Sequence, residues 1–179
     1  MTIPTVPHDP DQPAGPPARH LQPGDGWVEC DCGGRHWGLF GAAGLMLVRR
    51  TAGEVVSVVL QHRAVWSDQG GTWALPGGAR NPDESAEAGA LREAREEAGI
   101  DADDIVVLGT SVVDHGAWSY TTVIAQETPG ADVVPAVTDA ESIDVRWVPV
   151  DDVARLPLLA AFAAAWPGLR ARLETDPEG

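Results

Sequence analysis

The stretch of residues 77–100 constrains this chain more than any other part of it. Two glycines open the stretch, a run of helix-forming residues fills it, and another glycine closes it. Three carboxylates within the run stand at positions i, i+3 and i+4, which places them on one face of a helix: Glu93, Glu96 and Glu97. Like charges at this spacing repel each other and destabilise the helix. The pattern therefore predicts a site for a hard divalent cation such as magnesium, which takes oxygen ligands and commonly works beside substrate phosphates.

The remaining residues of this helix fit the same interpretation. Its apolar residues share the opposite face and would pack on a sheet: Ala90, Leu91, Ala94 and Ala98. Ser85 is the expected N-cap, and Gly99 stands where a left-handed residue ends a helix. Arg92 projects beside Glu96, where it can orient a carboxylate or meet a phosphate.

The stretch resembles the signature box of the Nudix hydrolases, in which glycines, a glutamate, an arginine and three further glutamates keep a fixed register. The matching positions are Gly78, Glu84, Arg92, Glu93, Glu96, Glu97, Gly99 and Ile100. Ala94 replaces a larger aliphatic residue of the family, which changes packing and not chemistry. A solvated acidic helix is the plain alternative, but it would not require the flanking glycines and the arginine.

The resemblance implies an α/β fold, an α/β/α sandwich with a mixed sheet between the box helix and a C-terminal helix, over about residues 40–165. It also implies a magnesium site, which manganese could fill, with room for a second metal. Its ligands would be the carbonyl of Gly77 and the carboxylates of Glu93, Glu96 and Glu97. Arg92 and Glu84 would orient this cluster. A glutamate from the loop before the last strand joins the cluster or serves as base in many relatives, and Glu141 is the first candidate, with Asp139 second; a solvated acid is the alternative.

Three residues outside the box are candidates for substrate binding. By the resemblance, Arg63 ends a strand that borders the cleft and could meet a phosphate; a surface salt bridge is the alternative. Because His62 precedes it on the strand, only one of the two can face the cleft. Trp118 and Tyr120 could stack on a base, although core packing is favoured for both. His115, in the preceding turn, is a further candidate general base.

The predicted reaction is metal-dependent hydrolysis of a pyrophosphate bond in a nucleoside diphosphate linked to another group. Water would attack one phosphorus, and Glu96, Glu97 or Glu141 would take its proton. Gly116, Trp118 and Asp68 stand where markers of three other subfamilies are expected, so a (deoxy)nucleoside triphosphate or an oxidised form such as 8-oxo-dGTP leads by elimination. ADP-ribose, dinucleoside polyphosphates and nucleotide sugars remain alternatives, as does a nucleotide sensor that does not cleave.

Composition narrows the partners. The 179 residues include 44% hydrophobic residues, enough for one domain, which we expect at residues 26–175 after a proline-rich disordered tail at 1–25. The net charge of −15 argues against a nucleic-acid or membrane partner but not against a nucleotide held through cations. None of the twelve basic residues is lysine, which excludes Schiff-base chemistry. The chain shows no signal peptide and no long apolar run, so we expect a cytoplasmic protein; a homodimer stays open.

A second group of metal-ligating residues lies near the N-terminus. Cys30, Cys32 and His36 offer two thiols and an imidazole within seven residues. A tetrahedral zinc site needs a fourth ligand, and no nearby residue supplies one. The sequence therefore favours a strand edge and glycine turn with two reduced thiols, and leaves zinc as the alternative.

Apolar runs and turn residues predict the remaining elements. Six strands are expected, at residues 42–48, 55–60, 72–76, 105–113, 119–125 and 143–148. A short helix at 150–156 and a last helix at 158–173 should follow, the latter with Phe162 and Trp166 buried. Pro167 predicts a break or a restart within the last helix.

Overall fold

The computed structural model describes residues 22–175, so the predicted tail at 1–25 lies mostly outside the described residues. Seven strands form one sheet: β3 (Ala42–Thr51), β4 (Glu54–Arg63), β5 (Trp73–Ala74), β6 (Gly77–Ala79), β7 (Ile105–Asp114), β8 (Ser119–Glu127) and β9 (Ser142–Pro149). The pair β3–β8 is parallel and the other pairs are antiparallel, which makes the sheet mixed, as predicted.

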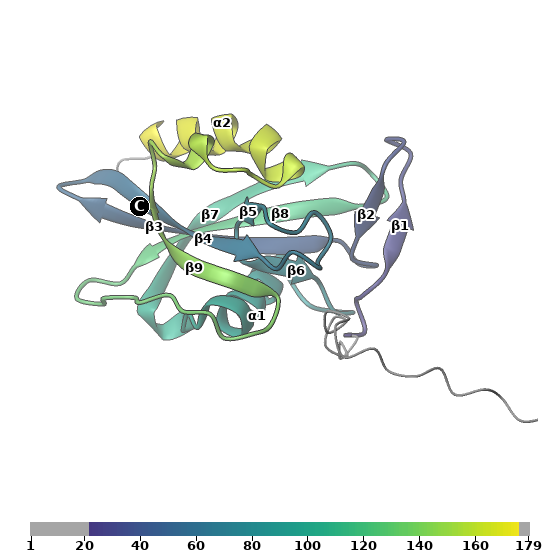
Figure 1. Ribbon diagram of the computed structural model, residues 1–179, viewed down its shortest axis with the longest axis horizontal. Coiled ribbons are helices and arrows are strands. Elements are labelled where there is room, and N and C mark those ends of the chain that lie inside the picture. The colour runs from purple at the N-terminus through teal and green to yellow at the C-terminus, as the bar shows by residue number, and fades with distance from the viewer. Residues whose placement is uncertain (1–21, 176–179) are drawn as a thin grey trace, which may run out of the picture.

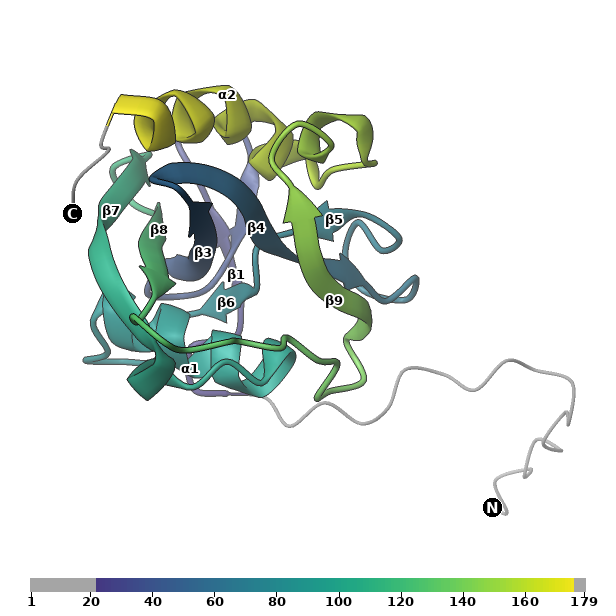
Figure 2. The ribbon, with the colours of Figure 1, turned by 90° about the vertical axis from the view of Figure 1, so that its left-hand side faces the viewer.

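Two helices cover opposite faces of this sheet (Figures 1 and 2): α1 (Ala86–Ala98) and α2 (Ala160–Thr175). One core cluster joins α1 to the sheet through Ala90, Ala94 and Leu45, among others. A second cluster joins α2 to the other face through Phe162, Trp166 and a different set of strand residues. The α/β/α sandwich is therefore confirmed, and the burial of Phe162 and Trp166 with it.

The ends of α1 follow from local chemistry. The Ser85 Oγ accepts a hydrogen bond from the Ala88 N–H at 3.1 Å and caps the helix. Gly99 ends it with φ of 65°, a left-handed conformation that glycine adopts without a steric penalty. Alanines on the inner face let α1 lie close to β3, and this places its acidic face beside the start of the box.

The strands β3 and β4 pair only near the turn that joins them, and then separate. The first part of β3 pairs instead with β6, which sets Ala43 opposite Gly78 and Gly44 opposite Gly77. The second part of β4 pairs with β5 and β9. This separation brings the glycines of the box onto the sheet, directly beside the helix that carries the carboxylates.

Two predictions about the C-terminal region were wrong. The predicted helix at 150–156 is a single 3-10 turn at Val153–Arg155, because Leu156 precedes a proline and is extended, with φ of −78° and ψ of 153°. The helix α2 runs through Pro167 without a break. Pro167 is exposed, while Trp166 and Leu169 on either side of it are buried against the sheet, and this burial outweighs the local cost of the proline.

The strands β1 (Trp27–Glu29) and β2 (Arg35–Trp37) form a separate two-stranded hairpin at one end of the molecule (Figure 1). It contains the strand edge and glycine turn expected around Cys30 and Cys32, with Gly33 at φ of 83°. Across residues 22–175, neither helix has the length and apolar character needed to cross a bilayer.

Candidate active site

Arg92 lies at the centre of a network that includes the backbone of the box. Its guanidinium donates to both carboxylate oxygens of Glu84, at 2.9 and 3.0 Å, and to the Ala79 carbonyl at 2.9 Å. It also donates to Glu93 Oε1 at 2.7 Å. The hydrogen bonds from Arg92 lower the pKa of Glu84, so this carboxylate stays ionised. Arg92 therefore fixes the direction in which Glu93 points.

Glu97 is the buried member of the three carboxylates, with 5% of the residue exposed. Its Oε2 accepts a hydrogen bond from the Gly77 N–H at 2.8 Å, which ties the helix to the first glycine of the box. Burial, and secondarily repulsion by Glu93, raise the pKa of Glu97 to about 8. Burial also raises the pKa of Glu93.

Gly78 lets the backbone approach the cluster closely. A Cβ added at this position would lie 2.6 Å from Glu93 Oε1, closer than real Cβ contacts allow. Only glycine leaves Glu93 in its observed place. Glu96, in contrast, is half exposed, and its Oε2 stands 3.5 Å from Arg92 Nη1, so the cluster is open to solvent at Glu96.

The chemistry of the acidic cluster suits a hard divalent cation. Glu93 lies close enough to Glu96 and Glu97 for their charges to repel, Glu97 is buried, and a bound cation would relieve both the burial and the repulsion. Glu93, Glu96 and Glu97 are the side chains that could hold it. The contribution of the Gly77 carbonyl stays a prediction, since the hydrogen bond between Gly77 and Glu97 is made by the Gly77 N–H.

The loop between β8 and β9 contributes the second acidic group. Asp139 Oδ1 accepts from the Ser142 hydroxyl at 2.8 Å, and Ser142 in turn accepts from the buried Gln61 amide at 2.9 Å. Gln61 also bonds the Glu97 carboxylate and lowers its pKa, while Asp139 repels that carboxylate and raises its pKa. Asp139 is therefore coupled to the cluster through Gln61 and Ser142.

Glu141 lies at the end of the same loop and is half-buried. Its backbone carbonyl accepts from the Ala64 N–H at 2.7 Å, which anchors it beside the end of β4. The role predicted for Glu141 remains a prediction, and so does that of Asp139, the second candidate, whose charge repels the Glu97 carboxylate. Sequence reasoning missed Gln61 and Ser142, because a glutamine within an apolar strand carries no signal of its own.

Arg63 and Tyr120 lie near each other beside the box. Burial, and secondarily the Glu97 carboxylate, raise the pKa of the Tyr120 hydroxyl. The positive charge of Arg63 acts in the opposite direction and lowers it in part. Arg63 donates to the Asp68 carbonyl at 3.2 Å and forms no ion pair with another residue of the described part of the chain. Its neighbour His62 instead stacks on Trp73, with ring centroids 4.7 Å apart.

Tyr120 reaches the box through Gly44. A Cβ added at Gly44 would lie 2.2 Å from the Tyr120 hydroxyl, so that hydroxyl rests against the backbone of β3. Trp118 lies further out. Its indole N–H donates to the Trp37 carbonyl at 3.1 Å, and its ring stacks on His36 with centroids 4.2 Å apart. One face of Trp118 is thus occupied by the hairpin, and base stacking stays a prediction for both aromatic residues.

A cavity of about 410 Å³ lies elsewhere. It is lined by residues of β4 and α2 and by the chain that follows β9, among them Val55, Asp151 and Arg170. None of the box residues lines it. The mutually repelling carboxylates of α1 beside the box glycines, and not cavity size, therefore mark the candidate site.

Comparison with known proteins agrees with this geometry. The NUDIX domain model matches residues 39–167. A nucleoside triphosphate pyrophosphatase/Nudix hydrolase fusion protein of Bifidobacterium longum is 52% identical over 162 residues; the match covers 89% of this chain and 34% of the fusion protein, so the chain spans about a third of that relative. A Mycobacterium tuberculosis protein with the provisional name 8-oxo-dGTP diphosphatase 3 is 47% identical, with 92% of this chain and 79% of that protein covered.

Among solved structures, the Nudix hydrolase RenU of M. smegmatis superposes with a TM-score of 0.77. It is 46% identical, and the match covers 87% of this chain and 99% of RenU. The residues that the sequence places in the Nudix box are those that the fold gathers around Arg92 and the first turns of the box. With a family model over most of its length, close relatives and a matching fold, this chain belongs to the Nudix hydrolase family.

Proposed function

We propose that this protein hydrolyses a pyrophosphate bond of a nucleoside diphosphate-linked compound with the help of magnesium, and that Glu93, Glu96 and Glu97 hold the metal. One observation carries the proposal. The buried Glu97, bonded to the Gly77 N–H, and Glu93, fixed by Arg92, lie beside two glycines that leave the backbone bare. Such a group of carboxylates is stable near neutral pH when a cation neutralises it.

The cation supplies one part of the chemistry when bound: it neutralises charge on the phosphate oxygens and makes a water molecule more acidic. The protein supplies the rest. Arg92 and Glu84 keep Glu93 in one orientation, because Arg92 forms two hydrogen bonds to Glu84 and one to Glu93. Glu96, Glu97 or Glu141 takes the proton of the attacking water, and the chain from Gln61 to Asp139 adds Asp139 to these candidates.

Arg63 and Tyr120 are the residues proposed to receive the substrate near this cluster. Arg63 is a cation that donates two hydrogen bonds to the Asp68 carbonyl rather than to a carboxylate, so its charge is available to a phosphate. Tyr120 carries an aromatic ring on β8, and the ring centroid of Trp118 lies 6.4 Å from it. A nucleobase could stack against this pair.

A (deoxy)nucleoside triphosphate, or an oxidised form such as 8-oxo-dGTP, is the proposed substrate. The names of two close relatives support this class, since one is called a nucleoside triphosphate pyrophosphatase fusion and the other an 8-oxo-dGTP diphosphatase. The fusion protein is about three times as long as the part that this chain matches. The triphosphate pyrophosphatase in its name could therefore be the part that this chain does not match. ADP-ribose, dinucleoside polyphosphates and nucleotide sugars remain in the test, and the cytoplasm remains the proposed location.

The test is phosphate release across a nucleotide panel with magnesium. The panel contains the dNTPs, 8-oxo-dGTP, ADP-ribose, diadenosine polyphosphates and nucleotide sugars. Added pyrophosphatase reveals released pyrophosphate, and product chromatography detects cleavages that release neither ion. The variants are Glu97→Gln and, as a matched control, Glu87→Gln, an exposed glutamate in the first turn of the same helix.

The proposal expects activity on one member of the panel, lowered about 100-fold or more by Glu97→Gln and unchanged by Glu87→Gln. Equal rates in the wild type and Glu97→Gln would contradict the assigned site. Tight binding of one nucleotide with no turnover of any would contradict the hydrolase and favour the sensor.

A further inference from the structure

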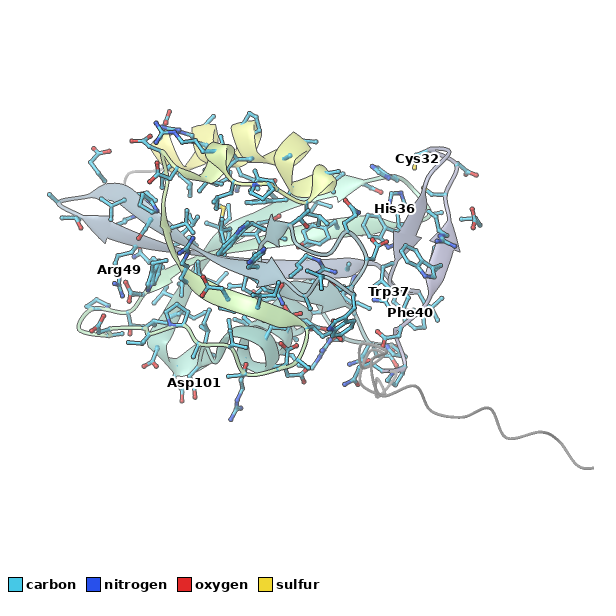
Figure 3. All side chains as sticks on the ribbon, in the orientation of Figure 1. Cys32, His36, Trp37, Phe40, Arg49 and Asp101 are labelled. Atoms are coloured by element: carbon cyan, nitrogen blue, oxygen red, sulfur yellow. The ribbon has the colours of Figure 1, made fainter. Side chains whose placement is uncertain are left out.

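The hairpin β1–β2 has little apolar packing of its own. It forms a separate two-stranded sheet, and its aromatic residue Trp27 is 39% exposed although it contacts Trp37 edge to face. Two-stranded hairpins are marginally stable unless something else holds them. Figure 3 shows Cys32 and His36 on this hairpin, at the end of the molecule opposite the turn between β3 and β4.

A turn from a distant part of the chain brings a fourth ligand to the three that the hairpin carries. His115, which follows β7, directs its Nδ1 at His36 Nε2, 3.0 Å away. Cys32 Sγ lies 3.1 Å from the same His36 nitrogen. The ligand atoms of Cys30, Cys32, His36 and His115 all lie within 4.8 Å of one another.

The Cys30 thiol donates to the His115 carbonyl at 3.9 Å, but ordinary hydrogen bonds do not account for the contacts of His36. The Nε2 atom of His36 carries either one proton or one lone pair, yet it meets both a thiol sulfur and a second imidazole nitrogen at bonding distance. It can serve one of these neighbours well and not both. A cation at the centre would instead accept a lone pair from each of the four atoms.

We propose that Cys30, Cys32, His36 and His115 form a structural zinc site. Two thiolates and two imidazoles are a set that zinc binds tetrahedrally, with bonds of about 2.0 to 2.3 Å. Such bonds place neighbouring ligand atoms about 3.3 to 3.8 Å apart, so the observed cluster needs shifts of about 1 Å or less in its side chains. Four protein ligands leave no open position, which makes the site structural rather than catalytic.

The turn of the hairpin supports two of the ligands. The Gly33 N–H donates to the Cys30 carbonyl at 2.9 Å, and the Cys30 N–H donates to the Gly34 carbonyl at 3.0 Å. These bonds fold the chain between Cys30 and His36 so that Cys30, Cys32 and His36 face His115. The turn is therefore organised for a metal through its backbone and does not depend on the side chains alone.

Zinc at this place would connect the hairpin to the β7–β8 turn, two parts of the chain separated by 79 residues between His36 and His115. It would also fix Trp118, because the ring of Trp118 stacks on His36 and its N–H bonds the Trp37 carbonyl. The zinc site thus differs from the proposed magnesium site in its residues and in its ligand chemistry, and neither proposal depends on the other.

Metal analysis of the purified full chain tests the proposal. The protein is produced in zinc-supplemented medium, freed of any affinity tag, and dialysed against metal-free buffer before zinc is measured per chain. The expected content is about one zinc per chain in the wild type and less than a tenth of that in Cys32→Ser and His115→Asn. Asp31→Asn is the matched control, since Asp31 is exposed between the two cysteines and should keep its zinc.

Two measurements on the wild type cover the case in which a variant does not fold. Cobalt(II) exchanged into the site should give the intense visible bands of a tetrahedral thiolate complex. The exposed Cys32 thiol should react with a thiol reagent slowly until a chelator is added, and then quickly. Zinc well below one per chain, equal zinc in Cys32→Ser, or a freely reactive Cys32 before chelation would each overturn the proposal.

Discussion

Arg92 and Glu84 face each other through two parallel hydrogen bonds, Nε to Oε1 at 2.9 Å and Nη2 to Oε2 at 3.0 Å. Glu84 also accepts from the Asn81 N–H at 2.9 Å, which holds it before the helix begins. Eight residues separate the two partners, so this contact fixes the loop of the box against the first part of α1. The planar guanidinium of Arg92 can form two parallel hydrogen bonds because its N–H groups match the spacing of the two carboxylate oxygens.

Replacing Arg92 with lysine should lower activity without unfolding the protein. Lysine keeps the charge but cannot bond both Glu84 oxygens and Glu93 at once, so Glu93 would lose its fixed orientation. We expect kcat/KM to fall about 10- to 100-fold, with more magnesium needed for half of the maximal rate. Steady-state kinetics against magnesium concentration measures both. Arg95→Lys, exposed on the same helix, should change neither; equal kinetics in Arg92→Lys and wild type would contradict the assigned role.

Glu97 should make the protein less stable as pH rises in the absence of added divalent cation. Its pKa is raised to about 8 in the folded chain, above the ordinary value of a glutamate, mainly by burial. The folded state then binds more protons than the unfolded state between these values, so the free energy of unfolding falls as pH rises through that window.

The variant Glu97→Gln removes this proton binding and keeps an acceptor for the Gly77 N–H. We expect it to be more stable than the wild type by about 1 to 3 kcal/mol at pH 8, with the difference shrinking toward pH 5. Urea unfolding at several pH values measures this. A gain that is the same at every pH would show that the cause is not the carboxylate charge, and Glu87→Gln should show no gain.

The sequence predicted α1 and its ends because capping is local. Ser85 and Gly99 act on backbone groups within a few residues. The helical spacing of Ala90, Ala94 and Ala98 alone predicts that they are buried on one face. The placement of the three carboxylates and Arg92 on α1 could be predicted for the same reason. The extended conformation of Leu156 also has a local cause, because Leu156 precedes a proline. The predicted helix at 150–156 was wrong because it extended to this residue.

Other parts of the molecule depend on distant contacts that a single sequence does not display. His115 reaches His36 only because the β7–β8 turn ends beside the hairpin, and Gln61 meets Ser142 across strands β4 and β9. Pro167 was expected to break α2, but its effect is decided by the buried neighbours Trp166 and Leu169. Local signals therefore gave the box, while tertiary contacts decide its supporting residues.

Gly78→Ala should lower activity although it leaves every proposed metal ligand in the chain. The added Cβ would lie 2.6 Å from Glu93 Oε1, so the carboxylate must move. A displacement of about 1 Å at a reacting centre commonly lowers the rate about 100-fold, and we expect a loss of this size in kcat/KM. Gly168→Ala is the matched control. Its added Cβ meets open space on α2, so it should keep full activity and gain about 0.5 to 1 kcal/mol of stability. Full activity in Gly78→Ala would show that Glu93 adapts freely.

Arg49 and Glu127 form a second paired contact, on the side of the sheet that faces the β8–β9 loop. Arg49 donates to both Glu127 oxygens, at 2.7 and 2.6 Å, and the Val133 N–H donates to Glu127 Oε1 at 2.8 Å. Arg49 also lies over the Trp147 ring, 4.4 Å from its centroid. These contacts hold the start of the loop that later supplies Asp139.

The hydrogen bonds from Arg49 lower the pKa of Glu127 below its ordinary value near 4.5. The contribution of this pair to stability is therefore present above that value and is lost as pH falls through the lower, folded-state pKa. Glu127→Gln should reduce the free energy of unfolding by about 1 to 3 kcal/mol at pH 7. The deficit should shrink below about pH 4, where the wild type loses the same ion pair. Urea unfolding from pH 7 down to acid measures the two curves, with Glu174→Gln at the exposed end of α2 as control. Parallel curves that never converge would mean that packing, and not the charge of Glu127, accounts for the loss.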